Sequence, residues 1–180
     1  ADMLPSKVGS LLSLNAIRED LEVSHRAVSH WMDIFDRLYF TFRLRPFTSR
    51  VIAGIKKEPK AYLWDWTLVE SPSARAENLV ASHLLKLCHW LEDVEGEAAE
   101  VWFLRDAWKR EVDFLVTVKR RTWFAVEVKL GEEPPSSHLE YFGTRLKVPF
   151  LFQVQVKGER DFTRGPVRIM PLASFLTALP

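Results

Sequence analysis

The stretch that decides the fold is Arg110-Glu111-Val112-Asp113-Phe114-Leu115-Val116, followed after a turn by Ala125-Val126-Glu127-Val128-Lys129. Both stretches have the alternating pattern of a β-strand with one buried face. The apolar row of the first is Val112, Phe114, Val116 and Val118, and that of the second is Phe124, Val126 and Val128. A carboxylate inside such a strand costs free energy unless a partner or a metal compensates its charge. The two strands therefore indicate both a hairpin and a candidate site.

The apolar rows also predict how the strands pair. Residues directly opposite each other in an antiparallel pair lie on the same face of the sheet. The two rows form one face only if even-numbered residues pair with even-numbered ones, as when Val118 pairs with Thr122 across a three-residue loop, residues 119–121. In this register Asp113 lies opposite Glu127, with Lys129 next along the strand. We therefore expect these three side chains to meet.

These residues resemble a known signature. Asp113 followed by Glu127-Val128-Lys129 resembles the PD-(D/E)xK nuclease motif. The surrounding sequence is similar to a domain of unknown function that forms the carboxyl-terminal part of many prokaryotic AAA-type ATPases. This similarity extends from about Leu11 to the carboxyl terminus, and the segments that carry it are residues 60–65, 77–85, 103–106, 110–114 and 126–129.

The resemblance implies a catalytic site in which Asp113, Glu127 and Glu77 are the metal ligands. Glu77 matches the acidic residue that the first core helix of such folds often supplies. Carboxylate oxygens are ligands that Mg²⁺ prefers. Lys129 would orient the attacking water or stabilise the transition state. On this interpretation Glu77, Asp113, Glu127 and Lys129 are the catalytic residues of a Mg²⁺-dependent deoxyribonuclease.

Residues 1–59 follow the plan of a winged helix. Leu11, Leu12 and Leu14 predict a first helix, and residues 15–21 a second. Ser24 is a suitable N-cap for a third helix over residues 25–38. Strands over residues 39–44 and 60–64 would form the wing. The predicted buried stripe of the third helix is Val28, Trp31, Met32, Phe35 and Leu38.

This module has two interpretations. In DNA-binding winged helices, residues off the buried stripe of the third helix enter the major groove, and the wing contacts the backbone. The candidate DNA-contacting residues here are Arg26, Ser29, His30, Lys56 and Lys57. Asp33 and Asp36 on the same helix would repel phosphate. The alternative is that the module packs on a partner domain, such as the ATPase.

Residues 60–180 predict a restriction-endonuclease-like domain, so the expected fold is α/β (α+β): a winged helix followed by a mixed sheet flanked by helices. The predicted elements are a helix over residues 77–90, an acidic loop over 92–100, strands over 100–104, 150–156 and 167–170 in addition to the hairpin, and helices over 139–146 and 171–179.

Composition narrows the partners. The formal net charge of +1 means that any nucleic-acid surface must be local. Cys88 is the single cysteine, so an intrachain disulfide is excluded, as is typical of proteins in the reducing cytoplasm. We expect its side chain to be buried. The sequence holds no Gly-x-x-x-x-Gly-Lys-Ser/Thr loop, so we expect no ATP binding. No apolar run has the length of a membrane span.

Two functions fit the sequence. The first is metal-dependent DNA cleavage at the acidic site. The second is a non-catalytic module that binds nucleic acid or protein for an ATPase, with Lys129 paired to Asp113 or Glu127 and no metal. The chain begins at Ala1 without an initiator methionine, which predicts a fragment or a processed product. Candidate partners are DNA, the ATPase module and a second copy of the chain.

Overall fold

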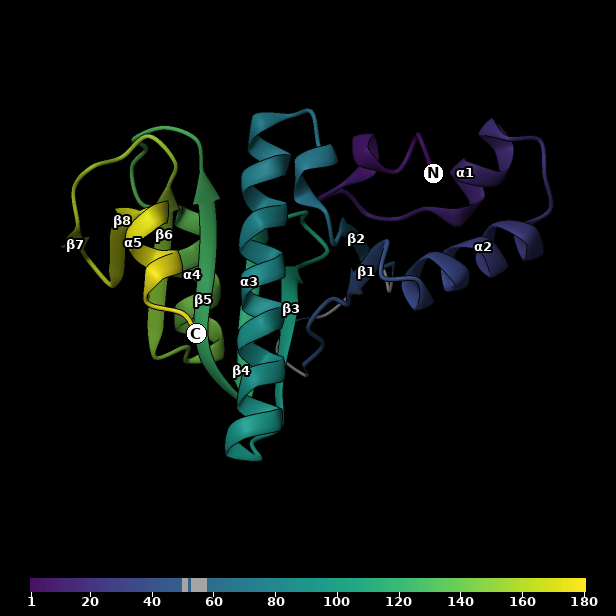
Figure 1. Cartoon of the computed structure of the whole chain (residues 1–180). Helices are drawn as coiled ribbons and strands as arrows, with labels where there is room; N and C mark the ends of the chain where they lie inside the picture. Colours follow the sequence, from purple (N-terminus) through teal and green to yellow (C-terminus); the bar gives the residue numbers. More distant parts are fainter. Residues whose placement is uncertain (50–51, 53–57) are drawn as a thin grey trace.

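Two β-sheets of unequal size organise the chain, a two-stranded sheet of β1 and β2 and a six-stranded sheet in the order β3-β4-β5-β6-β8-β7. The computed structural model describes residues 1–49, 52 and 58–180. Its elements are η1 (Pro5–Lys7), α1 (Leu14–Asp20), α2 (His25–Arg37), β1 (Thr41–Leu44), β2 (Lys60–Leu63), η2 (Trp66–Leu68), α3 (Pro72–Glu95), β3 (Ala99–Arg105), β4 (Glu111–Val118), β5 (Arg121–Lys129), α4 (Ser137–Leu146), β6 (Phe150–Gln155), β7 (Phe162–Arg164), β8 (Val167–Pro171) and α5 (Leu172–Thr177). Helices α1 and α2 lie on one side of the long helix α3, and strands β5 to β8 lie on the other (Figure 1).

The larger sheet is mixed and has helices on both faces. Strands β3, β4 and β5 are antiparallel, β5, β6 and β8 are parallel, and β7 returns antiparallel. Helices α3 and α5 cover one face, where Leu84 and Phe175 share an apolar cluster with Phe124. Helix α4 covers the other face, where Phe142 lies in a second cluster with Leu115. The predicted α+β class is confirmed.

The expected first helix at Leu11, Leu12 and Leu14 is wrong. Leu11 forms a β-bridge with Lys60, and the N–H of Leu12 donates to the carbonyl of Pro59 (2.8 Å), so this segment runs extended along β2. Strand pairing satisfies backbone groups that a helix would otherwise have paired. A 3₁₀ turn, η1, precedes the segment, and α1 begins at Leu14. The winged-helix plan stays a prediction.

The predicted stripe of α2 is only partly buried. Val28 and Met32 are 1% and 2% exposed, whereas Trp31 and Leu38 are 41% and 70% exposed. The elements that pack on α2, chiefly α1 and β1, cover only a narrow side of it. The predicted burial of Trp31 and Leu38 is therefore wrong.

Helix α3 is longer than predicted. The Ser71 hydroxyl accepts a hydrogen bond from the N–H of Ala74 at its start, and Gly96 ends it in the left-handed conformation (φ 67°). Residues 92–95 are helical, not part of a loop. Cys88 is 2% exposed, which confirms its burial. No helix in the described part of the chain is both long enough and apolar enough to cross a membrane.

The hairpin of β4 and β5 has the predicted register close to the candidate site. Phe114 pairs with Val126, and Val116 pairs with Phe124, so even-numbered residues face even-numbered ones. This confirms the pairing that the apolar rows require.

The turn of the hairpin differs from the prediction. Val118 pairs with Arg121 instead of Thr122, because the register shifts by one residue beyond Val116. The loop therefore consists of residues 119 and 120, whose φ angles are 50° and 62°. Two left-handed residues match the twist of a hairpin better than the usual right-handed turn does. The predicted three-residue loop is wrong.

Candidate functional site

A β-bulge in β4 sets the position of Asp113. The register between β3 and β4 shifts by one residue, so that Asp113 and Phe114 together stand opposite Phe103. Bulges of this kind redirect side chains and are common beside functional sites. The bulge also corrects a prediction, because Val112 belongs to the cluster beneath α4 with Leu115, while Phe114 belongs to the cluster beneath α3.

Asp113 lies among charges of both signs. Its Oδ2 atom accepts a hydrogen bond from the backbone N–H of Val128 (2.8 Å). Burial raises the pKa of the Asp113 carboxyl well above its ordinary value, and the charges of Glu77 and Glu127 raise it further. The charge of Lys60 lowers this pKa without cancelling the shift. A cation bound beside Asp113 would therefore stabilise the ionised form of its carboxyl.

Glu127 and Lys129 form an ion pair on β5 beside this aspartate. Lys129 Nζ lies 3.1 Å from Oε1 of Glu127 and 3.7 Å from Oε2 of Glu133. Glu127 is 8% exposed, and its Oε2 atom has no hydrogen-bond partner among the described residues. Burial raises the pKa of the Glu127 carboxyl, and Lys129, the backbone of Asp113 and the charge of His138 only partly oppose this. A buried acceptor without a donor indicates a position that a bound group would satisfy.

A lysine that the sequence did not single out completes the site. Lys60 opens β2 and is 1% exposed. Its Nζ atom lies 3.1 Å from Oε1 of Glu77 and 2.6 Å from Oε1 of Glu111, whose other oxygen pairs with Arg105. Burial alone would lower the pKa of Lys60, but the charges of Glu77, Asp113 and Glu111 raise it overall. Lys60 therefore carries a buried positive charge.

Glu77 is held on several sides by residues that precede α3 in the sequence. The hydroxyl of Tyr62 donates to Oε1 of Glu77 (2.7 Å). A Cβ atom on Gly9 would lie 2.9 Å from Oε2 of Glu77, so the close approach of this segment requires glycine, whose φ is 74°. Because α3 begins at Pro72, Glu77 lies in the second turn of the helix, beyond the first turn where its charge would favour the helix dipole.

The three acids expected to hold Mg²⁺ are not arranged around one point. Within the described residues, no group of three or more His, Cys, Asp or Glu side chains is placed to hold a metal ion. Glu77 is paired with Lys60 and Tyr62. Asp113, by contrast, has a raised pKa, and the Oε2 atom of Glu127 has no hydrogen-bond partner among the described residues. Two carboxylates suit a hydrated Mg²⁺, because this ion keeps several of its waters. The side chains present therefore fit one such ion held by Asp113 and Glu127.

Two buried glutamines hold the loop that follows Lys129. Gln153 Oε1 accepts from the N–H of Ser136 (2.8 Å), and its Nε2 donates to the carbonyl of Glu133 (2.9 Å). Gln155 Nε2 donates to the same carbonyl (3.2 Å). These bonds place Glu133 beside Lys129. Polar residues within the apolar strand β6 are the sequence signal that could have identified them.

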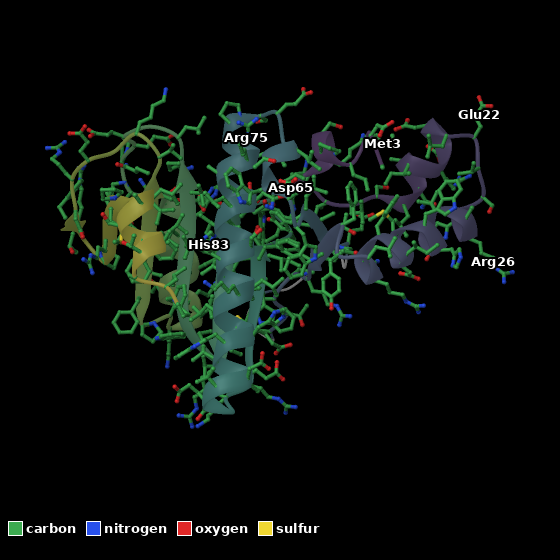
Figure 2. All side chains as sticks on the ribbon, in the orientation of Figure 1. Met3, Glu22, Arg26, Asp65, Arg75 and His83 are labelled. Carbon is green, nitrogen blue, oxygen red and sulfur yellow. The ribbon has the colours of Figure 1, made fainter. Side chains whose placement is uncertain are left out.

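The candidate DNA-contacting residues lie apart from this site. Arg26 and His30 are exposed on α2, and Ser29 is half-buried. Figure 2 shows Arg26 at the outer tip of the amino-terminal module, away from the six-stranded sheet. Lys56 and Lys57 lie outside the described residues.

Two family models match the chain. A model described as "Domain of unknown function (DUF4143)" matches residues 73–175, and one described as "Domain of unknown function (DUF8612)" matches residues 1–75. No curated protein and no solved structure matches the chain. The first match contains Glu77, Asp113, Glu127 and Lys129, and the second contains Lys60.

Proposed function

The chain belongs to the DUF4143 family, whose model covers more than half of its residues, and on that premise we propose that it is a divalent-cation-dependent phosphodiesterase acting on DNA. Asp113 and Glu127 are the proposed cation-binding carboxylates. Lys129 is proposed either to orient the attacking water or to stabilise the negative charge of the transition state.

One observation carries this proposal: two neighbouring buried carboxyls both have raised pKa values, and an oxygen of Glu127 has no partner among the described residues. An ion network built only for stability would be expected to satisfy such an atom. Burial is the largest cause of both shifts, and for Asp113 the charges of Glu77 and Glu127 add to it. Perturbed acids that lie together are typical of functional sites.

The side chains divide the chemistry between them. A bound divalent ion would lower the pKa of a water ligand and neutralise charge on the phosphate. Asp113 is held in place by the N–H of Val128, and Glu127 by Lys129. Lys129, held in turn between Glu127 and Glu133, places an ammonium where negative charge develops during hydrolysis.

The test is cleavage of supercoiled DNA with Mg²⁺ or Mn²⁺ by the chain and by Asp113→Asn. The asparagine keeps an acceptor for the N–H of Val128 but loses the charge. We expect cleavage to fall by at least about 100-fold, which corresponds to two decades of rate. Asp161→Asn is the matched control, because Asp161 is paired with Arg168 and takes no part in the proposed site. Equal cleavage by the wild type and Asp113→Asn would refute the assignment.

The ion pair of Lys60 with Glu77 favours a second candidate function. Because this pair removes one of the three expected metal ligands, the domain could serve as a non-catalytic module that binds protein or nucleic acid. Domains of this family are commonly found with AAA ATPases, so an ATPase is the proposed partner in either case. Failure of the wild type both to cleave DNA and to bind Mn²⁺ would favour this second function.

A further inference from the structure

The ammonium of Lys60 lies where a cation would be expected in an acidic site. It is 1% exposed, it is within 3.1 Å of Glu77 and 2.6 Å of Glu111, and it interacts electrostatically with Asp113. It also lies 5.5 Å from the centre of the Phe103 ring. A lysine with this degree of burial is rarely found without paired acids. Here three carboxylates share the one ammonium.

The charges connected through this ammonium do not balance. Five carboxylates, those of Glu77, Glu111, Asp113, Glu127 and Glu133, face three side chains that carry a full positive charge, those of Lys60, Arg105 and Lys129, and the imidazole of His138 also interacts with Glu127. With these acids and cations ionised and His138 neutral, two negative charges are left over. One divalent ion would balance that excess, whereas two would overshoot it.

We propose that Lys60 takes the place of a second cation, so that the site accepts a single divalent ion at Asp113 and Glu127. This inference rests on the proposed function, since it concerns the same acids. On this proposal Glu77 is a positioning residue that acts through Lys60 instead of ligating the ion. A residue of the segment matched by one family model, residues 1–75, thereby sets the metal stoichiometry of a site in the segment matched by the other, residues 73–175.

The geometry around Glu77 supports this assignment. Tyr62 donates to the same Oε1 atom that Lys60 contacts, and Gly9 lies against Oε2. Tyr62 is fully buried, and burial together with Glu77 raises its pKa well above the ordinary value, so its hydroxyl keeps its proton and donates. Two donors and a backbone segment therefore surround the carboxylate of Glu77. Asp113 and Glu127 are left as the acids that a divalent ion would bind.

The test is a titration of the full chain with Mn²⁺. Binding is measured by calorimetry and by the electron paramagnetic resonance signal of free Mn²⁺. The wild type should bind one equivalent. Lys60→Met keeps an unbranched side chain that is one heavy atom shorter and removes its charge, and it should bind Mn²⁺ at least about tenfold more tightly or take up a second equivalent. Lys119→Met removes one exposed, ion-paired lysine elsewhere and should match the wild type. An isotherm for Lys60→Met identical to that of the wild type would overturn the proposal.

A further measurement tests the proposal if the Lys60→Met protein does not fold. If Lys60→Met does not fold without added ion, millimolar Mn²⁺ should restore its thermal unfolding transition, because the ion fills the vacated position. No transition at any Mn²⁺ concentration would also overturn the proposal.

The same titrations separate this inference from the proposed function. If the wild type binds no Mn²⁺ but Lys60→Met does, the nuclease assignment and the single-ion site both fail, and only the exclusion of a cation by Lys60 stands. If wild-type binding depends on Asp113 but Lys60→Met behaves as the wild type, the nuclease assignment stands and the role of Lys60 fails.

Discussion

Asp113 and Glu127 lie at positions where burial disfavours ionisation, and neighbouring acids add to this effect at Asp113. Both pKa values are raised, and in each case burial is the largest cause. A group whose pKa rises on folding holds its proton more tightly in the folded state than in the unfolded state. At neutral pH these charges therefore reduce the stability of the ion-free protein. A divalent ion would relieve this cost and favour loss of the protons.

We expect Asp113→Asn to stabilise the ion-free protein at neutral pH by on the order of 1–3 kcal/mol. The gain has a pH dependence of fixed sign: for the wild type, the free energy of unfolding falls as pH rises from the ordinary aspartate pKa of 3.8 through the raised one. The advantage of Asp113→Asn should therefore vanish as pH is lowered towards 3.8. Urea unfolding in EDTA at a series of pH values measures both effects.

The control for this measurement has the opposite sign. Arg168 lowers the pKa of exposed Asp161 through a hydrogen bond, so Asp161→Asn should give no gain in stability at neutral pH. A destabilised Asp113→Asn protein at neutral pH would contradict the proposed charge balance.

At the scale of elements, two bulges shape the β4–β5 hairpin. The bulge opposite Phe103 turns Asp113 towards the charges around Glu77. A second shift, beyond Val116, leaves Trp123 unpaired between Phe124 and Thr122 on β5. The second shift changes the turn but preserves the even-numbered pairing nearer the site. The hairpin therefore accommodates a two-residue turn in place of the predicted three-residue loop without moving its charged residues.

That turn offers a second prediction. Lys119 and Arg120 both have left-handed φ angles, a conformation that costs most residues free energy and that Asn-Gly adopts readily. Replacing the pair by Asn-Gly should stabilise the protein by about 1 kcal/mol, as measured by chemical denaturation. The double variant Lys119→Ala and Arg120→Ala removes the same charges but keeps the strain, and it should show no gain. Equal stability of the two double variants would argue against left-handed strain in the turn.

Local patterns account for what the sequence could predict. Alternating apolar residues are enough to predict the hairpin, its register at Phe114 and the meeting of Asp113 with Glu127 and Lys129, because each depends on neighbours in sequence. Lys60 is different. A charge at the start of the apolar strand β2 is the same signal that identified Asp113, but its partner Glu77 belongs to a separate helix.

Two of the wrong predictions share a physical cause. Leu11 has the apolar character of a helix, yet it pairs with the distant Lys60. The bulge at Asp113 depends on how Phe103 of β3 is paired, which no local pattern encodes. Long-range pairing overrides local propensity in each case.

At the scale of the whole molecule, the two modules share one hydrophobic cluster. It contains Val28 and Met32 of α2 together with Leu84 of α3. Asn78 of α3 is fully buried, and its side chain accepts from the N–H of Leu63 (2.8 Å) and donates to the carbonyl of Leu63 (2.7 Å). Apolar contacts and a polar clamp thus join β2 to α3.

We therefore expect the chain to unfold in one cooperative transition, with equal calorimetric and van't Hoff enthalpies. Asn78→Ala should lower the free energy of unfolding by about 2–4 kcal/mol, because it leaves the backbone groups of Leu63 unpaired. Asn15→Ala, at an exposed position on α1, should change it by less than about 0.5 kcal/mol. Scanning calorimetry that resolves two separate transitions would contradict this coupling.

The contact between Lys60 and Glu77 crosses the limit between the two matched families, since Lys60 lies only within residues 1–75 and Glu77 only within residues 73–175. If one segment were exchanged between proteins without the other, Lys60 or Glu77 would be left buried without its ion-pair partner. Recombination at this junction is thus constrained by electrostatics, and the two segments are expected to be inherited as a pair.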